Sequence, residues 1–460
     1  MFNIPELVLK ANNFKEFNSV QVKALKNELY KENLVVSSPT SSGKTIVAEL
    51  SILESVLTNK RKAVYCCPLR ALASEHFNDL KKKYSKELGI KMTVSTGDFD
   101  SKSKYLSSYD LIFSTYEKVE SLIRHEAEWL KGIGLLVVDE IHEIDSSRGA
   151  TLEILITKLR LINPKLKILA LSATIPNSKD LADWLEAKLV SSDFRPVKLV
   201  EGVFFNNQLK FNHGLEKISL IKDELTSVVS DTLLKGKQAL VFCNSRRNAE
   251  SYAVKLSSLT RKFLKESDSM VLKKSSEKIK NVLEQPTEQC LKLANLSADG
   301  VGFHHAGLLS EQRHSLEGLF KLSHLKVLTS TPTLAAGVNL PAHTVIIPSL
   351  YRYSFNGMQE ISVREYKQLA GRAGRPKYDS NGRAVTLGKS EMDADRIFSH
   401  YINGVIEETF SQLSLEPVLR THLLSVIANN FVFDLKSLED FFSKTLYFHQ
   451  YGNLEALRDK

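Results

Sequence analysis

Residues 38–45, SPTSSGKT, have the composition and spacing of a loop that binds phosphate groups. The spacing matches the P-loop pattern, except that Ser38 stands where the pattern has its first glycine. An apolar run precedes the segment and a helical pattern follows it, which argues against a chance turn. Backbone N–H groups at a helix N-terminus would hold the phosphates. Lys44 would reach the β and γ phosphates, and Thr45 would bind Mg²⁺. The other loop residues expected to contact the nucleotide are Thr40, Ser41, Ser42 and Gly43.

Two adjacent acids, Asp139 and Glu140, end the apolar run of residues 135–144, LLVVDEIHEI. Asp139 would hold Mg²⁺, and Glu140 would orient or deprotonate an attacking water. Adjacent acids at a strand end are usually only solvated, but a P-loop about a hundred residues upstream favours the catalytic interpretation. His142 taken alone is expected to be structural.

The segment GRAGR at residues 371–375 places Arg372 and Arg375 three residues apart on a predicted helix, where they would share a face. Two guanidinium groups aimed at one target can stabilise the charge that develops during phosphoryl transfer. The alternative is an arginine pair on the surface.

Six short apolar runs in the first half are predicted to be buried parallel strands, because each is rich in β-branched residues and ends in polar or small ones. They are residues 33–38, 62–68, 91–96, 110–115, 134–140 and 167–173. Helical patterns fill the gaps, which indicates a doubly wound α/β domain. The loops that follow the strands are where such folds bind ligands.

A second alternating series follows Arg195 and Pro196. Its predicted strands are residues 238–244, 300–306, 325–331, 343–349 and 383–388. A helical, exposed insertion rich in Lys, Ser and Glu is expected over 256–296, and the pattern is mostly helical from about Gly404. The sequence therefore predicts an α/β protein with domains at 1–195, 196–402 and 403–460.

The chain has 460 residues, too long for one ordinary domain, and a net charge of +9. The positive excess is compatible with phosphate backbones as partners. No apolar run approaches the ~20 residues needed to span a bilayer, and the first residues lack the pattern of a secretory signal. Four scattered cysteines indicate neither a disulfide framework nor a zinc or iron–sulfur site. We expect a cytoplasmic protein without a membrane partner.

Taken in order, eight segments resemble the motifs of superfamily 2 helicases, in particular the Ski-type DExH branch. They are residues 38–45, 68–75, 139–142, 172–174, 242–250, 302–308, 330–342 and 368–376. Residues 419–428 and 441–451 are similar to the archaeal Hjm-type fork-repair helicases, relatives of the HELQ and polymerase theta helicases. The resemblance implies two tandem RecA-like domains followed by a winged-helix domain, which here would be truncated before the ratchet domain of that family.

The same resemblance implies an ATP-dependent 3′–5′ DNA helicase of fork repair that hydrolyses ATP with Mg²⁺ between its two RecA-like domains. Gln21 matches a residue that reads adenine, and Gly337 and Asn339 match positions beside ATP. Gln368 matches a residue that contacts the water or the phosphate, through His142. Ser172 and Thr174 match the motif that couples nucleotide state to strand grip. The implied partners are DNA with a single-stranded 3′ tail or a fork and replication or repair proteins, with the chain as a monomer.

On the strand side, five residues resemble contacts to the sugar-phosphate backbone, which carries no base information. They are Arg70, Thr115, Arg246, His305 and Thr333. Residues 349–363 are predicted to form a hairpin with a turn at Asn356-Gly357. Tyr351, Tyr353 and Phe355 could stack on the first separated base pair, or could simply cover the base of the hairpin.

Two other functions stay open. The chain could be an RNA helicase, because no residue that would recognise a 2′-hydroxyl stands out. It could also be an ATP-switched scaffold that binds nucleic acid without unwinding it, although the complete set of Lys44, Glu140, Arg372 and Arg375 argues against an inactive site.

Overall fold

The computed structural model describes residues 2–97, 104–125, 127–332, 340–354, 357–376 and 378–452. Contacts between Cα atoms divide the chain into two compact units. The first unit comprises Met1–Phe194 and Glu408–Lys460, and the second comprises Arg195–Glu407. Each unit has its own sheet and is described by itself below.

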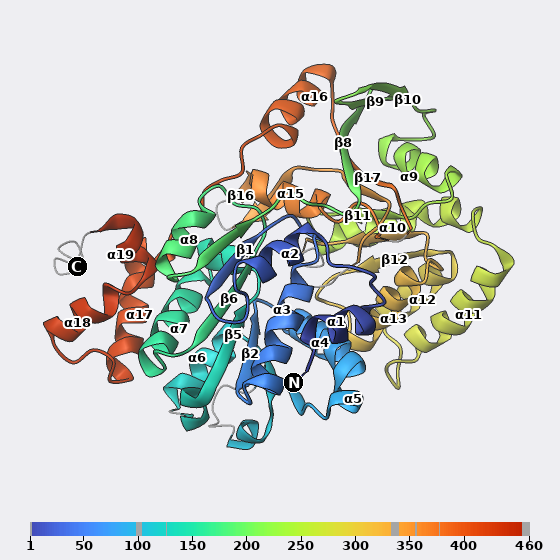
Figure 1. Cartoon of the computed structure of the whole chain (residues 1–460). Helices are drawn as coiled ribbons and strands as arrows, with labels where there is room; N and C mark the ends of the chain where they lie inside the picture. Colours follow the sequence, from blue (N-terminus) through green and yellow to red (C-terminus); the bar gives the residue numbers. More distant parts are fainter. Residues whose placement is uncertain are drawn as a thin grey trace. The chain divides into compact units, whose positions relative to one another are not determined.

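The first unit is built on a seven-stranded sheet in the order β3-β4-β2-β5-β6-β1-β7 (Figure 1). All of its pairings within the described residues are parallel. The strands are β1 Leu34–Ser37, β2 Lys62–Cys67, β3 Met92–Ser95, β4 Leu111–Thr115, β5 Ile133–Val138, β6 Lys167–Ser172 and β7 Lys188–Ser191. The six strands predicted from the first half of the sequence are confirmed. The edge strand β7 was not predicted, because its short and partly exposed sequence has no continuous apolar run.

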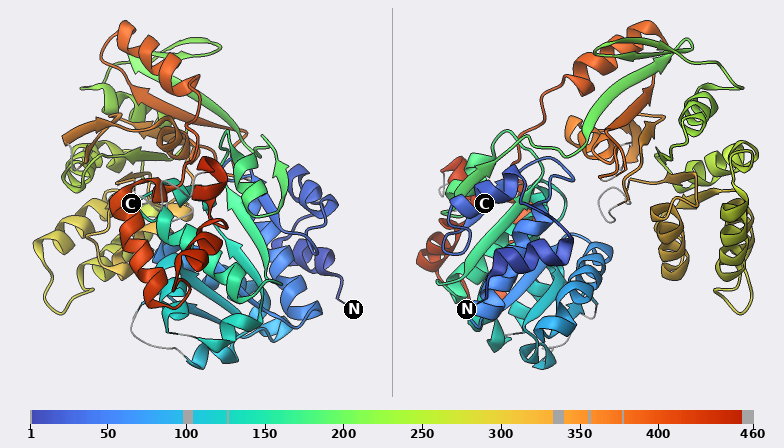
Figure 2. Two further views of the ribbon diagram at one scale, coloured as in Figure 1. Left: turned by 90° about the vertical axis from the view of Figure 1, so that its left-hand side faces the viewer. Right: turned by 45° about the vertical axis from the view of Figure 1, so that its right-hand side comes forward.

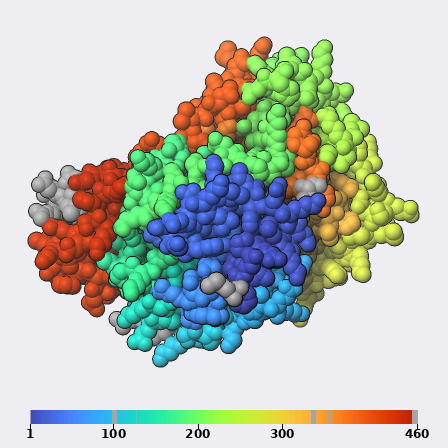
Figure 3. All heavy atoms as spheres, viewed as in Figure 1, coloured from blue at the N-terminus to red at the C-terminus, as the bar shows by residue number. Residues whose placement is uncertain are grey.

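Helices cover both faces of this sheet, which explains why its central strands are mostly apolar on both faces. Along β1, Leu34 and Val36 join one core cluster and Val35 joins the other. Helices α1 Ile4–Asn12, α2 Ser19–Lys26, α3 Lys44–Leu53 and α4 Arg70–Leu80 pack on the first cluster. Helices α6 Tyr116–Arg124, α7 Gly149–Ile162 and α8 Ser178–Trp184 pack on the second. In Figure 3 the N-terminal residues, in blue, form a continuous surface over their side of the unit.

The second unit has an eight-stranded sheet in the order β10-β9-β8-β17-β14-β11-β13-β12. The strands are β8 Lys198–Phe205, β9 Gln208–Phe211, β10 Gly214–Lys217, β11 Ala239–Phe242, β12 Val301–His304, β13 Val327–Ser330, β14 Thr344–Ile347 and β17 Asn381–Leu387. Neighbouring strands are parallel from β8 through β17, β14, β11 and β13 to β12. Strands β8, β9 and β10 form an antiparallel meander. The five predicted strands of this half are confirmed. The meander was missed because its outer strand is fully exposed and carries no apolar pattern.

The expected helical insertion is confirmed as the end of α10 Arg246–Arg261, α11 Glu266–Lys280 and most of α12 Glu288–Ala298. One face of it is buried through Leu272, Ile279 and Leu293, so the insertion is not wholly exposed. The other helices of the unit are α9 Glu224–Leu234, α13 Ser310–Lys321, α15 Val363–Ala370 and α16 Glu391–Ile397. None of the helices in the described ranges combines the length and apolar composition that a membrane crossing requires.

The prediction that Arg372 and Arg375 share a helical face is wrong. Helix α15 ends at Ala370, and the backbone of 371–375 instead pairs with Ala342. The Ala342 N–H donates to the Arg372 carbonyl at 3.1 Å, and the Gly374 N–H donates to the Ala342 carbonyl at 2.7 Å. Gly374 has φ +93°, and a Cβ there would lie 2.5 Å from Val197 Cγ1, so this turn requires a glycine.

The C-terminal segment packs on the first unit. Its helices α17 Glu416–Ala428 and α19 Leu446–Tyr451 contact α7 and α8, and α18 Leu435–Phe442 lies between them in the sequence (Figure 2). A separate apolar cluster joins Ala150 and Ile154 of α7 to residues of this segment. The mostly helical character predicted from Gly404 onward is confirmed. The segment expected as a third domain at 403–460 thus groups, from Glu408, with the first unit, and its winged-helix identity stays a prediction.

Two buried charged residues of α7 lie under this segment. Glu153 is fully buried and accepts hydrogen bonds from Ser411 Oγ at 2.6 Å and from the Tyr447 N–H at 2.7 Å. Burial raises the pKa of Glu153 to about 7, although these donors oppose the shift. Lys158 pairs with Glu120 of α6 at 3.1 Å and donates to Ser425 Oγ of the segment at 3.5 Å. The segment is therefore held by polar contacts as well as by apolar packing.

Glu153 is expected to make stability depend on pH. A carboxyl whose pKa is raised on folding binds its proton more tightly in the folded state, so its contribution falls as pH rises from about 4.5 to about 7. The loss amounts to at most ~3 kcal/mol. We expect Glu153→Gln, which has no proton to lose, to remove this part of the pH dependence of the melting temperature between pH 5 and pH 8. The exposed Glu128→Gln should follow the wild-type profile. Parallel profiles for wild type and Glu153→Gln would contradict the prediction.

Candidate functional site

The P-loop lies where the sequence predicts it, between β1 and α3 of the first unit. Gly43 has φ +91°, and a Cβ there would lie 2.6 Å from Gln21 Nε2, so only glycine fits. Lys44 Nζ donates to the carbonyls of Ser38 at 2.7 Å and Pro39 at 3.0 Å. Ser38 Oγ lies 2.7 Å from Ser42 Oγ. The serine at the first glycine position of the motif is thus accommodated by a hydrogen bond inside the loop.

Gln21 lies against this loop. Its Oε1 accepts from the Asn18 N–H at 2.9 Å, and its Nε2 donates to the Gly43 carbonyl at 3.3 Å. Asn18 Nδ2 donates to the Ser42 carbonyl at 2.9 Å. The capping box at the start of α2 therefore positions Gln21 beside the loop, and a contact to adenine stays a prediction.

Asp139 follows the end of β5, is buried and has several hydrogen-bonding partners. Its Oδ2 accepts from Tyr65 OH at 2.9 Å and lies 3.2 Å from His76 Nε2. Its Oδ1 accepts from the Glu140 N–H at 3.0 Å, and Tyr116 OH donates to its carbonyl. Burial acts to raise the pKa of Asp139, but hydrogen bonds from His76 and Tyr65 and the charges of His76 and Lys44 lower it below its usual value. The carboxylate is therefore ionised at neutral pH.

His142 connects Glu140 to the segment at 172–174. Its Nδ1 accepts from the Ala173 N–H at 3.2 Å and lies 3.5 Å from Glu140 Oε2. Glu140 has φ +53°, an uncommon conformation for a residue other than glycine. Because Nδ1 accepts a backbone hydrogen bond, the imidazole carries its proton on Nε2 when neutral. One imidazole therefore lies beside both the predicted catalytic carboxylate and the segment predicted to respond to nucleotide state.

The possible ligand atoms at this edge of the sheet suit Mg²⁺. A threonine hydroxyl at Thr45 and an ionised carboxylate at Asp139 are the hard oxygen ligands that Mg²⁺ prefers. The charge of Lys44 contributes to the low pKa of Asp139, which places the P-loop lysine within electrostatic reach of that carboxylate. Thr45 and Asp139 would hold the ion.

Sequence reasoning missed Tyr65, His76 and Tyr116. Tyr65 lies on β2, which pairs with β5, and Tyr116 begins α6 after β4. His76 lies six residues into α4. Their approach to Asp139 depends on the strand order of the sheet, and the sequence carries no signal for that order.

In the second unit, Arg375 has a set of partners that the sequence did not predict. Its Nε donates to Asp379 Oδ2 at 3.1 Å, and its guanidinium also donates to Ser323 Oγ at 3.0 Å and to Gln238. Lys237 pairs with the same Asp379 at 2.8 Å. Gln368 lies on α15, and Arg372 is half-buried in the turn that follows. Gly337 and Asn339 fall outside the described residues.

The structure places two of the predicted strand contacts beside one another in the second unit, whereas in the first unit it shows only their positions on the elements. Thr115 at the end of β4 is paired in register with Cys67, three residues before Arg70. In the second unit, a Cβ on Gly307 would lie 3.2 Å from Arg246 Nη1 and 3.1 Å from His305 Nδ1, so both side chains crowd that glycine. Thr333 is not among the described residues.

The predicted hairpin is confirmed as β15 Tyr351–Ser354 paired antiparallel with β16 Gly357–Glu360. Tyr353 is 80% exposed, which leaves its ring open to solvent. Tyr351 hydrogen-bonds Glu360, which raises the pKa of the phenol. Phe355 is outside the described residues. Of the two visible aromatic side chains, Tyr353 is therefore the better candidate to meet a base.

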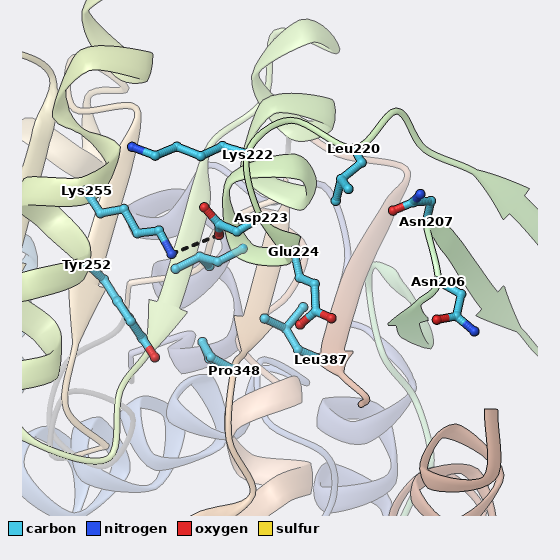
Figure 4. A pocket seen from close by; sticks show the side chains of 11 residues that line it. Asn206, Asn207, Leu220, Lys222, Asp223, Glu224, Tyr252, Lys255, Pro348 and Leu387 are labelled. Atoms are coloured by element: carbon cyan, nitrogen blue, oxygen red, sulfur yellow. Dashed lines mark ion pairs between the residues drawn. The ribbon is translucent and has the colours of Figure 1, made fainter. Parts of the chain in front are cut away.

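A cavity of about 610 Å³ opens at the carboxyl ends of β14 and β17 (Figure 4). Its lining includes Lys222, Glu224 and Tyr252 and the ion pair of Lys255 with Asp223 at 3.0 Å. None of the predicted site residues lines this cavity.

Comparison with known proteins agrees with this geometry. The DEAD/DEAH box helicase family matches residues 18–181, and the helicase conserved C-terminal domain matches residues 255–377. Similar proteins include the ATP-dependent DNA helicase Hel308 of Methanocella arvoryzae, 43% identical over 93% of this chain and 58% of the relative. The proteins of that name from Pyrococcus horikoshii and Caldivirga maquilingensis are each 42% identical, over 98% and 93% of this chain and 62% and 56% of their own lengths. The chain thus spans about three fifths of the relatives that it matches.

Proposed function

Because the chain belongs to the DEAD/DEAH box helicases of superfamily 2 and matches Hel308 helicases over at least 93% of its length, we propose that it is an ATP-dependent DNA helicase. The observation that carries the proposal is the arrangement of the P-loop, Asp139, Glu140 and His142 in one unit. That arrangement combines phosphate binding, an ionised carboxylate and a second carboxylate fixed beside a histidine.

Each of these groups has a distinct task in ATP hydrolysis. The P-loop N–H groups and Lys44 bind the phosphates, for which Lys44 must leave the carbonyls that it now contacts. Glu140 orients or deprotonates the attacking water, and His142 lies between Glu140 and the segment at 172–174, where it accepts from the Ala173 N–H. Mg²⁺ on Thr45 and Asp139 would neutralise phosphate charge.

The second unit is proposed to supply the remaining positive charge that the triphosphate needs during hydrolysis. Arg372 and Arg375 would stabilise the triphosphate as the bond to the γ phosphate breaks, and Gln368 would orient the water or the phosphate. Gln21 would read adenine, with Gly337 and Asn339 beside the nucleotide. In the described structure Arg375 is bound to Asp379, so contact with phosphate requires that it give up or share this partner.

The proposed substrate is DNA with a single-stranded 3′ tail or a fork, on which the chain moves 3′–5′ as a monomer. Arg70, Thr115, Arg246, His305 and Thr333 would contact the backbone, with Tyr353 and Phe355 at the duplex junction. A role in fork repair with replication or repair proteins, and a cytoplasmic location, are part of the same proposal. Strand displacement measured on 3′-tailed DNA and RNA duplexes tests it. Displacement of RNA alone would favour an RNA helicase, and ATP hydrolysis without displacement would favour a scaffold.

Lys44→Ala is expected to abolish ATP hydrolysis, because no other described side chain of the loop carries positive charge to the β and γ phosphates. Phosphate release measured with saturating single-stranded DNA checks this. The exposed Lys165→Ala serves as the control and should hydrolyse ATP at the wild-type rate. Near-normal turnover in Lys44→Ala would reject the P-loop assignment.

Arg375→Ala is expected to leave ATP binding mostly intact and to lower turnover by about 10³-fold or more. The structure adds a competing explanation, since the same change leaves buried Asp379 with Lys237 as its remaining cationic partner. Lys237→Ala removes the other partner of that carboxylate and keeps the guanidinium. Both variants should melt at lower temperature, but only Arg375→Ala should lose turnover. Equal losses of turnover would show that Arg375 acts only through the fold.

Tyr353→Ala is expected to slow displacement of a duplex about tenfold without changing ATP hydrolysis on single-stranded DNA, because stacking on one base contributes ~1–3 kcal/mol. Gln359→Ala is the matched control. Gln359 is exposed on the same hairpin, but it pairs with Arg352 and so points to the other face. A loss of hydrolysis that parallels the loss of displacement would count against a role at the junction.

A further inference from the structure

The Asp139 carboxylate is fixed by two side chains that lie outside the helicase motifs named above. Tyr65 OH from β2 donates to Oδ2 at 2.9 Å, and His76 Nε2 from α4 lies 3.2 Å from the same oxygen. The two rings lie 4.8 Å apart between centroids, and Tyr65 rests in turn on Phe113 at 5.5 Å. Tyr65 is buried and the His76 side chain is 13% exposed. Aromatic packing therefore holds both partners at one carboxylate oxygen.

The distribution of hydrogen bonds makes the two oxygens of Asp139 unequal. A carboxylate oxygen has about two lone-pair sites. Tyr65 and His76 fill those of Oδ2, whereas Oδ1 receives the Glu140 N–H at 3.0 Å. Among the described contacts, Oδ1 therefore has one lone-pair site left at which a cation could bind.

We propose that His76, supported by Tyr65, is a positioning residue that orients Asp139 so that Oδ1 serves the metal ion. The inference rests on the proposed Mg²⁺-dependent ATPase function. Without the imidazole, the carboxylate could rotate about its Cβ–Cγ bond, and the oxygen offered to the ion would no longer be fixed. Removal of a residue that hydrogen-bonds a metal ligand commonly changes metal affinity 10- to 100-fold.

A purely structural role for His76 makes a different prediction. Burial acts to lower the pKa of His76, but the hydrogen bond and charge of Asp139 raise it, so the pair also stabilises the packing of α4 on the sheet. Loss of that packing would lower the melting temperature. It would change nucleotide binding equally with and without Mg²⁺, because the P-loop contacts do not involve His76.

Binding of a fluorescent ADP, measured with and without MgCl₂, separates these roles without requiring turnover. We expect His76→Ala to keep the Mg²⁺-free affinity and to lose about tenfold of the gain that Mg²⁺ provides. His76→Gln can place its Nε2 near the position of the imidazole Nε2 and should recover most of that gain. Tyr65→Phe removes one hydrogen bond but keeps the ring, and should show a smaller loss. Asn78→Ala, exposed on the same helix, is the control.

A His76→Ala protein that melts earlier but keeps its full gain from Mg²⁺ would overturn the positioning role, as would a Tyr65→Phe protein with no loss if His76→Ala fails to fold. A wild-type protein whose affinity for ADP is the same with and without Mg²⁺ would instead reject the proposed function, and the inference with it. The magnesium concentration that gives half-maximal ATP hydrolysis should rise in the same order, from Asn78→Ala through Tyr65→Phe to His76→Ala.

Discussion

The candidate site of the first unit depends on one buried carboxylate that stays charged at the edge of the sheet. Asp139 is almost fully buried, where an isolated charge would be strongly disfavoured. The structure resolves this with hydrogen bonds from Tyr65, His76 and the Glu140 backbone, and with the nearby charge of Lys44. The cost of an anion at this position is thus offset by groups from β2, α4 and the P-loop. The strand order of the sheet determines which elements can supply them.

Much of the fold could be predicted because both faces of each parallel sheet are buried. Runs such as Leu34–Ser37 are buried at every position and apolar except for the last residue, and this pattern marks a central strand without any knowledge of its neighbours. The edge strands β7 and β10 were missed for the opposite reason, since both are largely exposed and carry no such run. The prediction of a helix at 371–375 was wrong, because Gly374 adopts a positive φ that a helical pattern in the sequence does not reveal.

The site was predictable to the extent that its chemistry lies in local segments. The P-loop and the Asp139–Glu140 pair are short motifs, and their placement at strand ends follows from the fold. Other partners come from distant segments, and no spacing in the sequence connects His76 to Asp139 or Gln238 to Arg375. Such contacts depend on how the fold brings together segments that are far apart in the sequence.

The stiffness of helix α4 couples the movement of two residues that lie at different points along it. It begins at Arg70, predicted to contact the DNA backbone, and carries His76 about 9 Å further along its axis. A helix resists stretching, so a pull on its first residue moves the imidazole by a comparable amount. If Arg70 contacts DNA as proposed, tension in that strand would be transmitted to the edge of the sheet that carries Asp139 by the stiffness of less than two helical turns.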